Sequence, residues 1–461
     1  MDTRKEVDPL GERLIPKDAY FGIQTLRATE NFPVSGIKAP LPFIRAYVLI
    51  KKAAATANMQ AGCLDDKKAK AIIAACDEVL AGKLLDQFVV DVFQAGAGTS
   101  FNMNVNEVLA NRALEILGNQ KGDYKTVSPN DNVNMGQSTN DTFPTALHIS
   151  VLIALQPLLT TLDELAQAFE ELGKKYAHVL KSGRTHLQDA VPLTIGQEFT
   201  AYGSAIANGC NELRRRQETL YSVALGGTAV GTGANAHPKY KQIAIADLAK
   251  LTGFPLKSAT NNFEALQSHR PAQTVSSGLK ELALELIRIA NDLRLLASGP
   301  TTGFNEIVLP PVQPGSSIMP GKVNPVMAEC LDMVAYQVVG NDFATSLAVQ
   351  AGQMELNVMT PTIMYNMLFS IQILSNFIPV FTSKCVKGIT INEKQCNQYL
   401  DHNPSLATLL APYIGYMEAA KIAKQAQAEN RSVKEIALEK VLLKPEEIEK
   451  IFSRKNLLNE Q

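Results

Sequence analysis

The chain has 461 residues, and its 44 basic and 45 acidic residues leave a formal net charge of −1. This balance gives no reason to expect nucleic acid or an anionic membrane as a partner. The polar start lacks a signal-peptide core, and no uninterrupted apolar run approaches the ~20 residues that span a bilayer. The six cysteines contain no C-x-x-C pair. We therefore expect a cytoplasmic protein with reduced thiols, without a zinc site, and with neither nucleic acid nor membrane as a partner.

Abundant Ala and Leu, sparse aromatic residues and the lack of Trp favour helices packed on helices. Residues 1–45 are rich in Pro and Gly, so we expect an irregular arm there. Arg27 in this arm is a possible carboxylate fork, although a surface arginine is the simpler interpretation. Apolar residues at helical spacing then predict helices over residues 44–60 and 66–80.

Two polar segments follow, each directly ahead of a helical pattern. In the first, Gly96 and Gly98 break the chain, and Thr99 or Ser100 is placed to cap a helix through 105–117. A helix start also presents free N–H groups to an anion, but capping alone needs no ligand.

The second segment consists of short polar residues at 136–141, ahead of a long helix expected from about Pro144. A cap uses one or two such residues. We therefore expect a binding role for Ser138, Thr139 and Asn140.

The middle of the chain carries long apolar stripes. Apolar residues step by three or four over 147–172, and four further helices are predicted through 199–220, 279–296, 327–347 and 363–381. The class is therefore all-α, with an elongated central five-helix bundle flanked by two smaller helical domains. We predict an N-terminal domain at 1–142, the bundle at 143–393 and a small C-terminal helical domain at 394–461. Residues 226–235 are glycine-rich but contain no dinucleotide fingerprint.

A polar break at 183–189 contains His186 beside Arg184 and Thr185. The imidazole is suited to donating to a carboxylate or moving a proton near neutral pH. A lone histidine is more often structural, and its polar neighbours make the functional alternative equally good. No histidine or carboxylate spacing indicates a metal site.

The most distinctive segment is the loop at 315–325, Gly-Ser-Ser-Ile-Met-Pro-Gly-Lys-Val-Asn-Pro. It combines two hydroxyls (Ser316, Ser317), one cation (Lys322) and one amide (Asn324), which suit a small anion and a nearby proton transfer. Its glycines are suited to hinging a segment that closes over a ligand and excludes water. The spacing does not fit a phosphate-binding P-loop, and an ordinary linker is the alternative.

The polar breaks lie between long helices and therefore fall at ends or kinks of a bundle. One bundle cannot easily bring breaks at opposite ends into a single pocket. Apolar stripes on several helix faces are suited to packing bundles from different subunits together. We therefore predict a homo-oligomer with shared active sites.

The loop 315–325 resembles the signature of the aspartase/fumarase superfamily, and residues 183–190 and 136–141 resemble its other signature regions. The resemblance extends over nearly the whole chain. It implies a homotetramer with a twenty-helix core, sites built from three subunits, and reversible elimination that yields fumarate.

Shorter motifs are similar to the aspartase branch, which implies reversible deamination of L-aspartate to fumarate and ammonia. These motifs are Gly96 to Ser100, Thr25 to Ala28, and Ser128 in place of histidine. Residues 262–269 instead resemble class II fumarases, which convert malate to fumarate and water. Two positions, Thr301 and Ala411, depart from the usual pattern and bear on substrate scope.

The resemblance also implies residue roles. Ser316 would be the general base, abstracting the β-proton to give a doubly charged aci-carboxylate. Thr185, His186, Ser317 and Lys322 would surround that carboxylate. Lys322 and Asn324 would hold the other carboxylate, and Thr99, Ser138, Thr139 and Asn140 would surround the amino group. The catalytic residues would thus be Ser316, His186 and Lys322, with no cofactor and no metal.

Two rival functions remain beside this one. Class II fumarase has the same fold, and Ser100 and Ser128 argue against it. A non-catalytic helical scaffold, such as a lens-crystallin-like relative, would be expected to lose the loop residues. Ser316, Lys322, Asn324 and His186 are all present, which argues against a scaffold.

Overall fold

The computed structural model describes residues 2–459, and it is mostly helical, as predicted. Contacts between backbone positions divide the chain into two compact units. Unit 1 comprises residues 1–159, 211–283 and 336–375, and unit 2 comprises 160–210, 284–335 and 376–461. The predicted boundaries at 142 and 393 are not tested by this division and stay a prediction.

Five long helices form the central elements, and each has residues in both units. They are α5 (Thr139–Lys175), α6 (Ile195–Gln217), α9 (Arg270–Leu296), α10 (Val326–Gln350) and α11 (Thr360–Lys384). All five correspond to the five helices predicted from the apolar stripes.

The long helices pack against one another within each unit. In unit 1, Gln156 of α5 bonds Gln217 of α6, and Arg216 of α6 bonds Glu281 of α9. Lys280 of α9 bonds Asp342 of α10, and Asn341 of α10 bonds Ser370 of α11. Unit 2 links α5, α6, α9 and α10 through Phe169–Phe199, Tyr202–Asp292 and Arg294–Asp332. Polar and aromatic contacts therefore join neighbouring helices within each unit.

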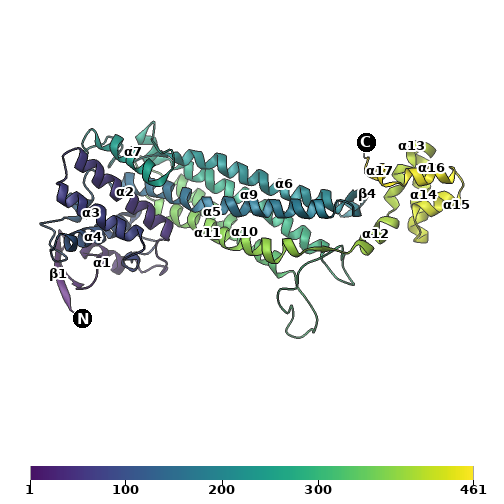
Figure 1. Ribbon diagram of the computed structural model, residues 1–461, viewed down its shortest axis with the longest axis horizontal. Coiled ribbons are helices and arrows are strands. Elements are labelled where there is room, and N and C mark those ends of the chain that lie inside the picture. Colours follow the sequence, from purple (N-terminus) through teal and green to yellow (C-terminus); the bar gives the residue numbers. More distant parts are fainter. Residues whose placement is uncertain (1, 460–461) are drawn as a thin grey trace. The chain divides into compact units, whose positions relative to one another are not determined.

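Unit 1 adds shorter helices and two small sheets. The helices are α1 (Ile23–Asn31), α2 (Leu41–Gln60), α3 (Asp66–Leu80), α4 (Thr99–Ile116), α7 (Tyr240–Thr252) and α8 (Asn262–Gln267), and the strands are β1 (Thr3–Asp8), β2 (Gly11–Pro16), β5 (Ser222–Val223) and β6 (Lys257–Ser258). Helix α2 packs on α3 and α7, and α3 packs on α4 (Figure 1). Rings of Phe43, Tyr47, Phe101 and Phe143 pack together with centroids 4.8–6.1 Å apart.

The expectation of an irregular arm over residues 1–45 is wrong. The segment forms the antiparallel hairpin β1–β2 and then α1. The buried carboxylates of Glu6 and Glu107 accept hydrogen bonds from backbone N–H groups at the start of α1, in place of an ordinary cap. Arg27 on α1 is a carboxylate fork, with Nε 2.8 Å and Nη2 2.9 Å from the oxygens of Asp8, and this pair ties α1 to β1.

The predicted start of α5 near Pro144 is also wrong, because the helix begins at Thr139 and Pro144 lies inside it. A proline usually interrupts a helix because it lacks an N–H donor. Here the hydroxyls of Thr142 and Thr145 donate to the carbonyls of Ser138 and Asp141 at 2.8 and 2.7 Å. These side-chain bonds supply extra donors to the first turns of α5.

Unit 2 contains the antiparallel hairpin of β3 (Leu180–Thr185) and β4 (Gln188–Thr194), the pair β7 (Ile307–Val308) and β8 (Thr390–Ile391), and a series of short helices. These helices are α12 (Glu393–Asp401), α13 (Ala411–Ile414), α14 (Tyr416–Glu429), α15 (Val433–Glu439), α16 (Pro445–Ile451) and α17 (Arg454–Leu457), with the 3-10 helix η6 (Pro404–Leu409) before α13. Buried Leu410, Ile422, Val433, Ile436 and Ile448 form their common core.

Two segments, Thr139–Lys175 and Thr360–Gly388, are long and apolar enough on average to meet a length-and-composition criterion for a bilayer span. The sequence contains no uninterrupted apolar run long enough to span a bilayer. These two segments meet the criterion because it averages hydropathy over a window that includes polar residues. In these windows 67% and 50% of the residues are buried within the protein, which is the pattern of core helices.

Gly98 provides a test of packing at the start of α4. Its φ is +85°, and a Cβ there would collide with the ring of Phe143. Gly118 has a similar φ of +80° but open space around it. We predict that Gly98→Ala lowers the free energy of unfolding by about 3 kcal/mol and Gly118→Ala by about 1 kcal/mol, since only the first adds a steric clash to the backbone strain.

Denaturant unfolding of the two glycine variants beside the unmodified chain measures the difference. Equal losses in both variants would contradict the packing of Phe143 against Gly98.

Candidate active site

The first group of predicted site residues lies in unit 1. Helix α4 begins at Thr99, and its N-cap is Gly98, without a side-chain capping bond. The expectation that Thr99 or Ser100 caps this helix is therefore wrong. Thr99 is exposed, and both residues line a cavity of about 410 Å³ that also contains Arg27 and Asp8. The Thr99 side chain is thus not used for capping and stays accessible to a ligand.

Ser138 directly precedes α5, and Thr139 and Asn140 are its first two residues. The Thr139 hydroxyl accepts from Asn102 Nδ2 at 2.9 Å, and Asn140 Nδ2 donates to the carbonyl of Ala229 at 2.8 Å. The Ser138 hydroxyl accepts from the N–H of Asn140 at 3.2 Å. Thr139 is buried, whereas Ser138 and Asn140 are partly exposed.

A buried carboxylate anchors this segment to the glycine-rich loop at 226–235. Asp141 is fully buried and accepts from the N–H groups of Ser138, Gly226 and Thr228 at 2.9–3.0 Å. Burial raises the pKa of Asp141 to about 6, while these backbone donors and the charge of Lys51 act in the opposite direction. The loop and the start of α5 are therefore held together from inside.

Lys51 on α2 holds the same region from the other side. It is fully buried, and its Nζ donates to Asn102 Oδ1, Asn134 Oδ1 and Gln137 Oε1 at 2.8, 3.0 and 2.9 Å. Burial lowers the pKa of Lys51 to about 7, and the negative charge of Asp141 opposes this shift. Since Asn102 also bonds Thr139, the ammonium group fixes the side chains beneath the polar segment.

Sequence reasoning missed Lys51, although the sequence carries a signal. It stands four residues after Tyr47 and seven after Ile44, on the apolar face of the predicted helix. A cation on such a face must find polar partners inside the protein.

The second group of site residues lies in unit 2. Residues 183–189, predicted to be a polar break between helices, instead belong to the β3–β4 hairpin. His186 and Leu187 form the turn with φ of 56° and 58°, the backbone that a tight two-residue hairpin requires. Thr185 and His186 are exposed at its tip, so the strands present them to a partner or ligand.

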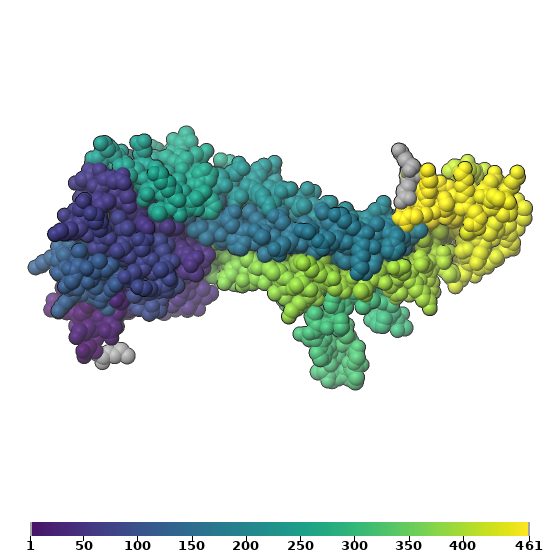
Figure 2. Space-filling model, in the orientation of Figure 1, coloured from purple at the N-terminus to yellow at the C-terminus, as the bar shows by residue number. Residues whose placement is uncertain are grey.

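The loop 315–325 is closed at its base by hydrogen bonds between its own residues. Gly315 N–H donates to the carbonyl of Lys322 at 2.8 Å, and Asn324 Nδ2 donates to the carbonyl of Gly315 at 2.5 Å. A Cβ at Gly315 would collide with Lys322 and Asn324, so glycine is required here. In Figure 2 the segment around this loop, coloured green, stands out from the surface. Ser317 and Lys322 are exposed.

Ser316 lies in a small nest of backbone donors. Its Oγ accepts from the N–H groups of Met319 at 2.9 Å and Ile318 at 3.3 Å. Successive N–H groups of this kind stabilise negative charge on an oxygen. The loop therefore already contains donors for a Ser316 alkoxide.

Among the described residues, no hydrogen bond joins the hairpin tip directly to the loop 315–325. Residues 2–459 also contain no group of three or more His, Cys, Asp or Glu side chains placed to hold a metal. All six cysteines are described, and none forms a disulfide.

Comparison with known proteins identifies the family. A family model described as "Lyase" matches residues 11–340, and one described as "Fumarase C C-terminus" matches residues 406–459. The chain belongs to the aspartase/fumarase superfamily of lyases. This confirms the resemblance of the signature loop and the mostly helical fold.

Similar proteins cover nearly the full length of this lyase. An aspartate ammonia-lyase from a Bacillus species is 49% identical, over 98% of this chain and 97% of the relative. A class II fumarate hydratase from Thermosynechococcus vestitus is 47% identical, over 100% of this chain and 99% of the relative. The crystal structure of a fumarate lyase:delta crystallin from Brucella melitensis bound to cobalt superposes with a TM-score of 0.95 at 49% identity, covering 98% of each chain.

The buried ammonium group gives a stability prediction with a neighbouring control. Lys51→Met keeps the volume but leaves the amide oxygens of Asn102 and Gln137 without their donor, so we predict a loss of about 3 kcal/mol in the free energy of unfolding. Lys52→Met removes only a surface ion pair with Asp77, so its loss stays below about 1 kcal/mol.

Thermal and denaturant unfolding of both lysine variants check this prediction. If Lys51→Met were as stable as Lys52→Met, the network around Thr139 would not depend on Lys51.

Proposed function

We propose that this lyase catalyses the reversible deamination of L-aspartate to fumarate and ammonia. The observation that carries the proposal is the loop 315–325, in which two backbone N–H groups already bond Ser316 Oγ. Further support comes from aspartate ammonia-lyases that are 47–49% identical over 98–99% of this chain. Ser100 and Ser128, which resemble the aspartase branch, favour ammonia over water as the leaving group.

Ser316 is the proposed general base. Its alkoxide takes the β-proton of aspartate, and the electron pair moves into the adjacent carboxylate to give a doubly charged aci-carboxylate. The pair then returns to form the carbon–carbon double bond as the carbon–nitrogen bond breaks, and the nitrogen departs as ammonia. The N–H groups of Ile318 and Met319 favour the charged form of the base.

Stabilising the growing charge is the main catalytic task. Thr185, His186, Ser317 and Lys322 are the proposed donors to the aci-carboxylate, and all four are exposed in unit 2. Lys322 and Asn324 are also the proposed donors to the α-carboxylate of the substrate. The amide of Asn324 has a second role that sequence reasoning missed, since its Nδ2 closes the loop base on Gly315.

Thr99, Ser138, Thr139 and Asn140 are the proposed surroundings of the substrate ammonium group. Hydroxyl and amide oxygens accept hydrogen bonds from an ammonium without adding a full charge. The buried contacts of Lys51 and Asp141 preorganise the start of α5, so these oxygens lose little freedom on binding.

We also propose a cytoplasmic homotetramer with a twenty-helix core and sites shared among three subunits. The exposed face of α10 supports association. Tyr336, Phe343 and Leu347 follow one another at helical spacing and are 55%, 68% and 52% exposed, with Gly340 on the same face. An apolar face of this kind is suited to packing against helices of other copies. A monodisperse monomer in sedimentation would contradict this assembly.

Class II fumarase is the alternative function, supported by the 47% identical relative and by the fumarase-like residues 262–269. The test is fumarate formation, followed by its ultraviolet absorbance, with L-aspartate and L-malate in separate reactions. We expect absorbance to rise with L-aspartate alone. A rise with L-malate alone would overturn the proposal.

The role of Ser316 gives a sharper prediction. Ser316→Ala removes the base but leaves the proposed carboxylate donors, so we expect kcat to fall by about 10²–10⁴-fold while fumarate binding remains measurable. Ser383→Ala on α11, where the hydroxyl bonds only helix carbonyls, is the control and keeps its kcat.

Steady-state kinetics and calorimetric titration with fumarate make the comparison. Near-normal kcat in Ser316→Ala would exclude Ser316 as the base.

A further inference from the structure

A buried cluster of charges lies in unit 2, outside the proposed site. The carboxylate of Glu306 is fully buried and contacts two cations from strand β3. Arg184 Nη1 donates to Glu306 Oε2 at 2.9 Å, and Nη2 lies 2.9 Å from Oε1. Lys181 Nζ lies 2.9 Å from Glu306 Oε2 and also bonds Glu198 at 2.9 and 3.1 Å. Two cations and two anions therefore balance.

The geometry of this cluster is well defined. The Arg184 guanidinium contacts the carboxylate with two nitrogens and lies over the ring of Phe304, 4.3 Å from its centroid. A guanidinium held in this way is fixed in direction as well as distance. Buried ion clusters are weak contributors to stability, because desolvation cancels most of the attraction. Their value lies in specifying one arrangement of the segments that carry them.

The cluster joins two segments that carry proposed site residues. Arg184 immediately precedes Thr185 and His186 at the hairpin tip. Glu306 stands nine residues before Gly315, at the start of the segment leading into the signature loop. Its backbone is also fixed, because its N–H donates to Leu296 at 3.0 Å and its carbonyl accepts from Asn392 N–H at 2.9 Å. A firmly held carboxylate thus contacts the strand that leads directly to the tip.

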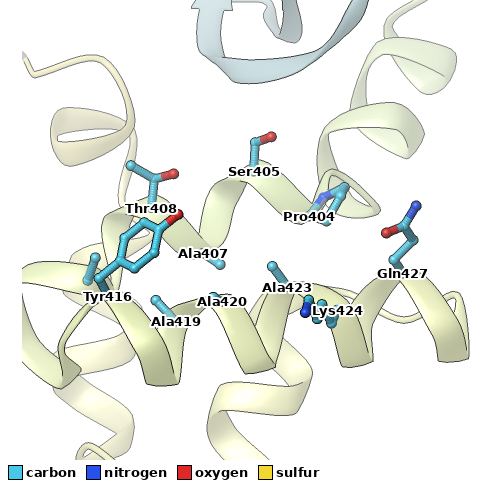
Figure 3. A pocket seen from close by; sticks show the side chains of 11 residues that line it. Pro404, Ser405, Ala407, Thr408, Tyr416, Ala419, Ala420, Ala423, Lys424 and Gln427 are labelled. Carbon is cyan, nitrogen blue, oxygen red and sulfur yellow. The ribbon is translucent and has the colours of Figure 1, made fainter.

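Residues at the start of the 3-10 helix η6 also hold the hairpin. Buried Asn403 donates through Nδ2 to Ser182 Oγ at 2.6 Å and to the carbonyl of Ala190 at 2.7 Å. The Ser405 hydroxyl donates to the carbonyl of Asp189 at 2.9 Å. Figure 3 shows Ser405 pointing away from the side chains of α14, on which η6 packs. Both strands of the hairpin are therefore fixed, and only the tip is free.

We propose that Glu306 and Arg184 are positioning residues that set the direction of the Thr185–His186 tip relative to the root of the loop 315–325. This inference rests on the proposed function and adds residues that do not touch the substrate. Because Thr185 and His186 are proposed to bind the carboxylate whose charge grows in the transition state, their misplacement reduces kcat more than it raises KM.

The main test compares Glu306→Gln with the conservative Glu306→Asp and with Arg184→Lys, which keeps the charge but loses the guanidinium fork. We expect Glu306→Gln and Arg184→Lys to lower kcat about tenfold or more with KM within about twofold, since small displacements of positioned groups are costly. Glu306→Asp retains the charge and recovers part of kcat.

Asp342→Asn is the matched control. Asp342 is likewise a buried carboxylate that contacts a cation, Lys280, but it lies in the middle of α10 rather than near the hairpin or the loop. We expect it to lower the melting temperature without lowering kcat. A kcat loss in Asp342→Asn equal to that in Glu306→Gln would overturn the positioning role.

Hydrogen exchange provides a second readout that does not depend on turnover. Peptides covering residues 180–194 are expected to exchange faster in Glu306→Gln and Arg184→Lys than in Asp342→Asn. Unchanged exchange of residues 180–194 together with normal kcat would overturn the inference. If Glu306→Gln does not fold, the same comparison is made with Arg184→Lys. If the unmodified enzyme did not deaminate L-aspartate, the proposed function would fail, while faster exchange at 180–194 would still support the cluster.

Discussion

Long apolar helices confine the polar chemistry of this lyase to the segments between them. Helix α5 alone has 37 residues, and α9, α10 and α11 have 25 or more each. Their interiors are filled by packing, so a dicarboxylate substrate can meet concentrated hydrogen-bond donors only at helix starts, hairpin turns and loops. The proposed site residues lie in such places, namely at Thr99, the start of α5, the hairpin tip at His186 and the loop at Ser316.

These segments are short and would be mobile without support, and buried charges supply that support. Lys51 and Asp141 hold the start of α5 in unit 1, and Glu306 with Arg184 and Lys181 holds the hairpin in unit 2. In each case a charged group is satisfied by several partners, which gives direction at little net stability. The exposed residues beside them are left available to bind and react.

Much of the helical fold was predictable from the sequence. The helix predicted at 66–80 is α3, with the same bounds, and all five long helices were found from their apolar spacing. The hairpin at 180–194 was missed because its turn is His186–Leu187 rather than Asn-Gly, and its strands lack clean alternation. The start of α5 was misplaced because Pro144, usually a helix boundary, is accommodated inside it.

The candidate site was predictable where residues are consecutive in the sequence. The loop 315–325 and the segment 136–141 stand out by composition and by resemblance, and their roles stay predictions. The pairing of Arg184 with Glu306 was not predictable, because the two residues are 122 residues apart and nothing in either local pattern indicates the other. The carboxylate partner of Arg27 was likewise visible only in three dimensions.

If the proposed sites are shared among subunits, Asn140 and Ser316 of one site come from different copies of the chain. The most direct measurement is the activity of mixed oligomers made by coexpressing Asn140→Ala with Ser316→Ala, each of which we expect to have little activity alone. Random mixing in a tetramer would restore about a quarter of the unmodified activity, because one site in four would receive both intact segments. If both segments came from the same copy, every site would carry one defect, and the mixed oligomers would remain inactive.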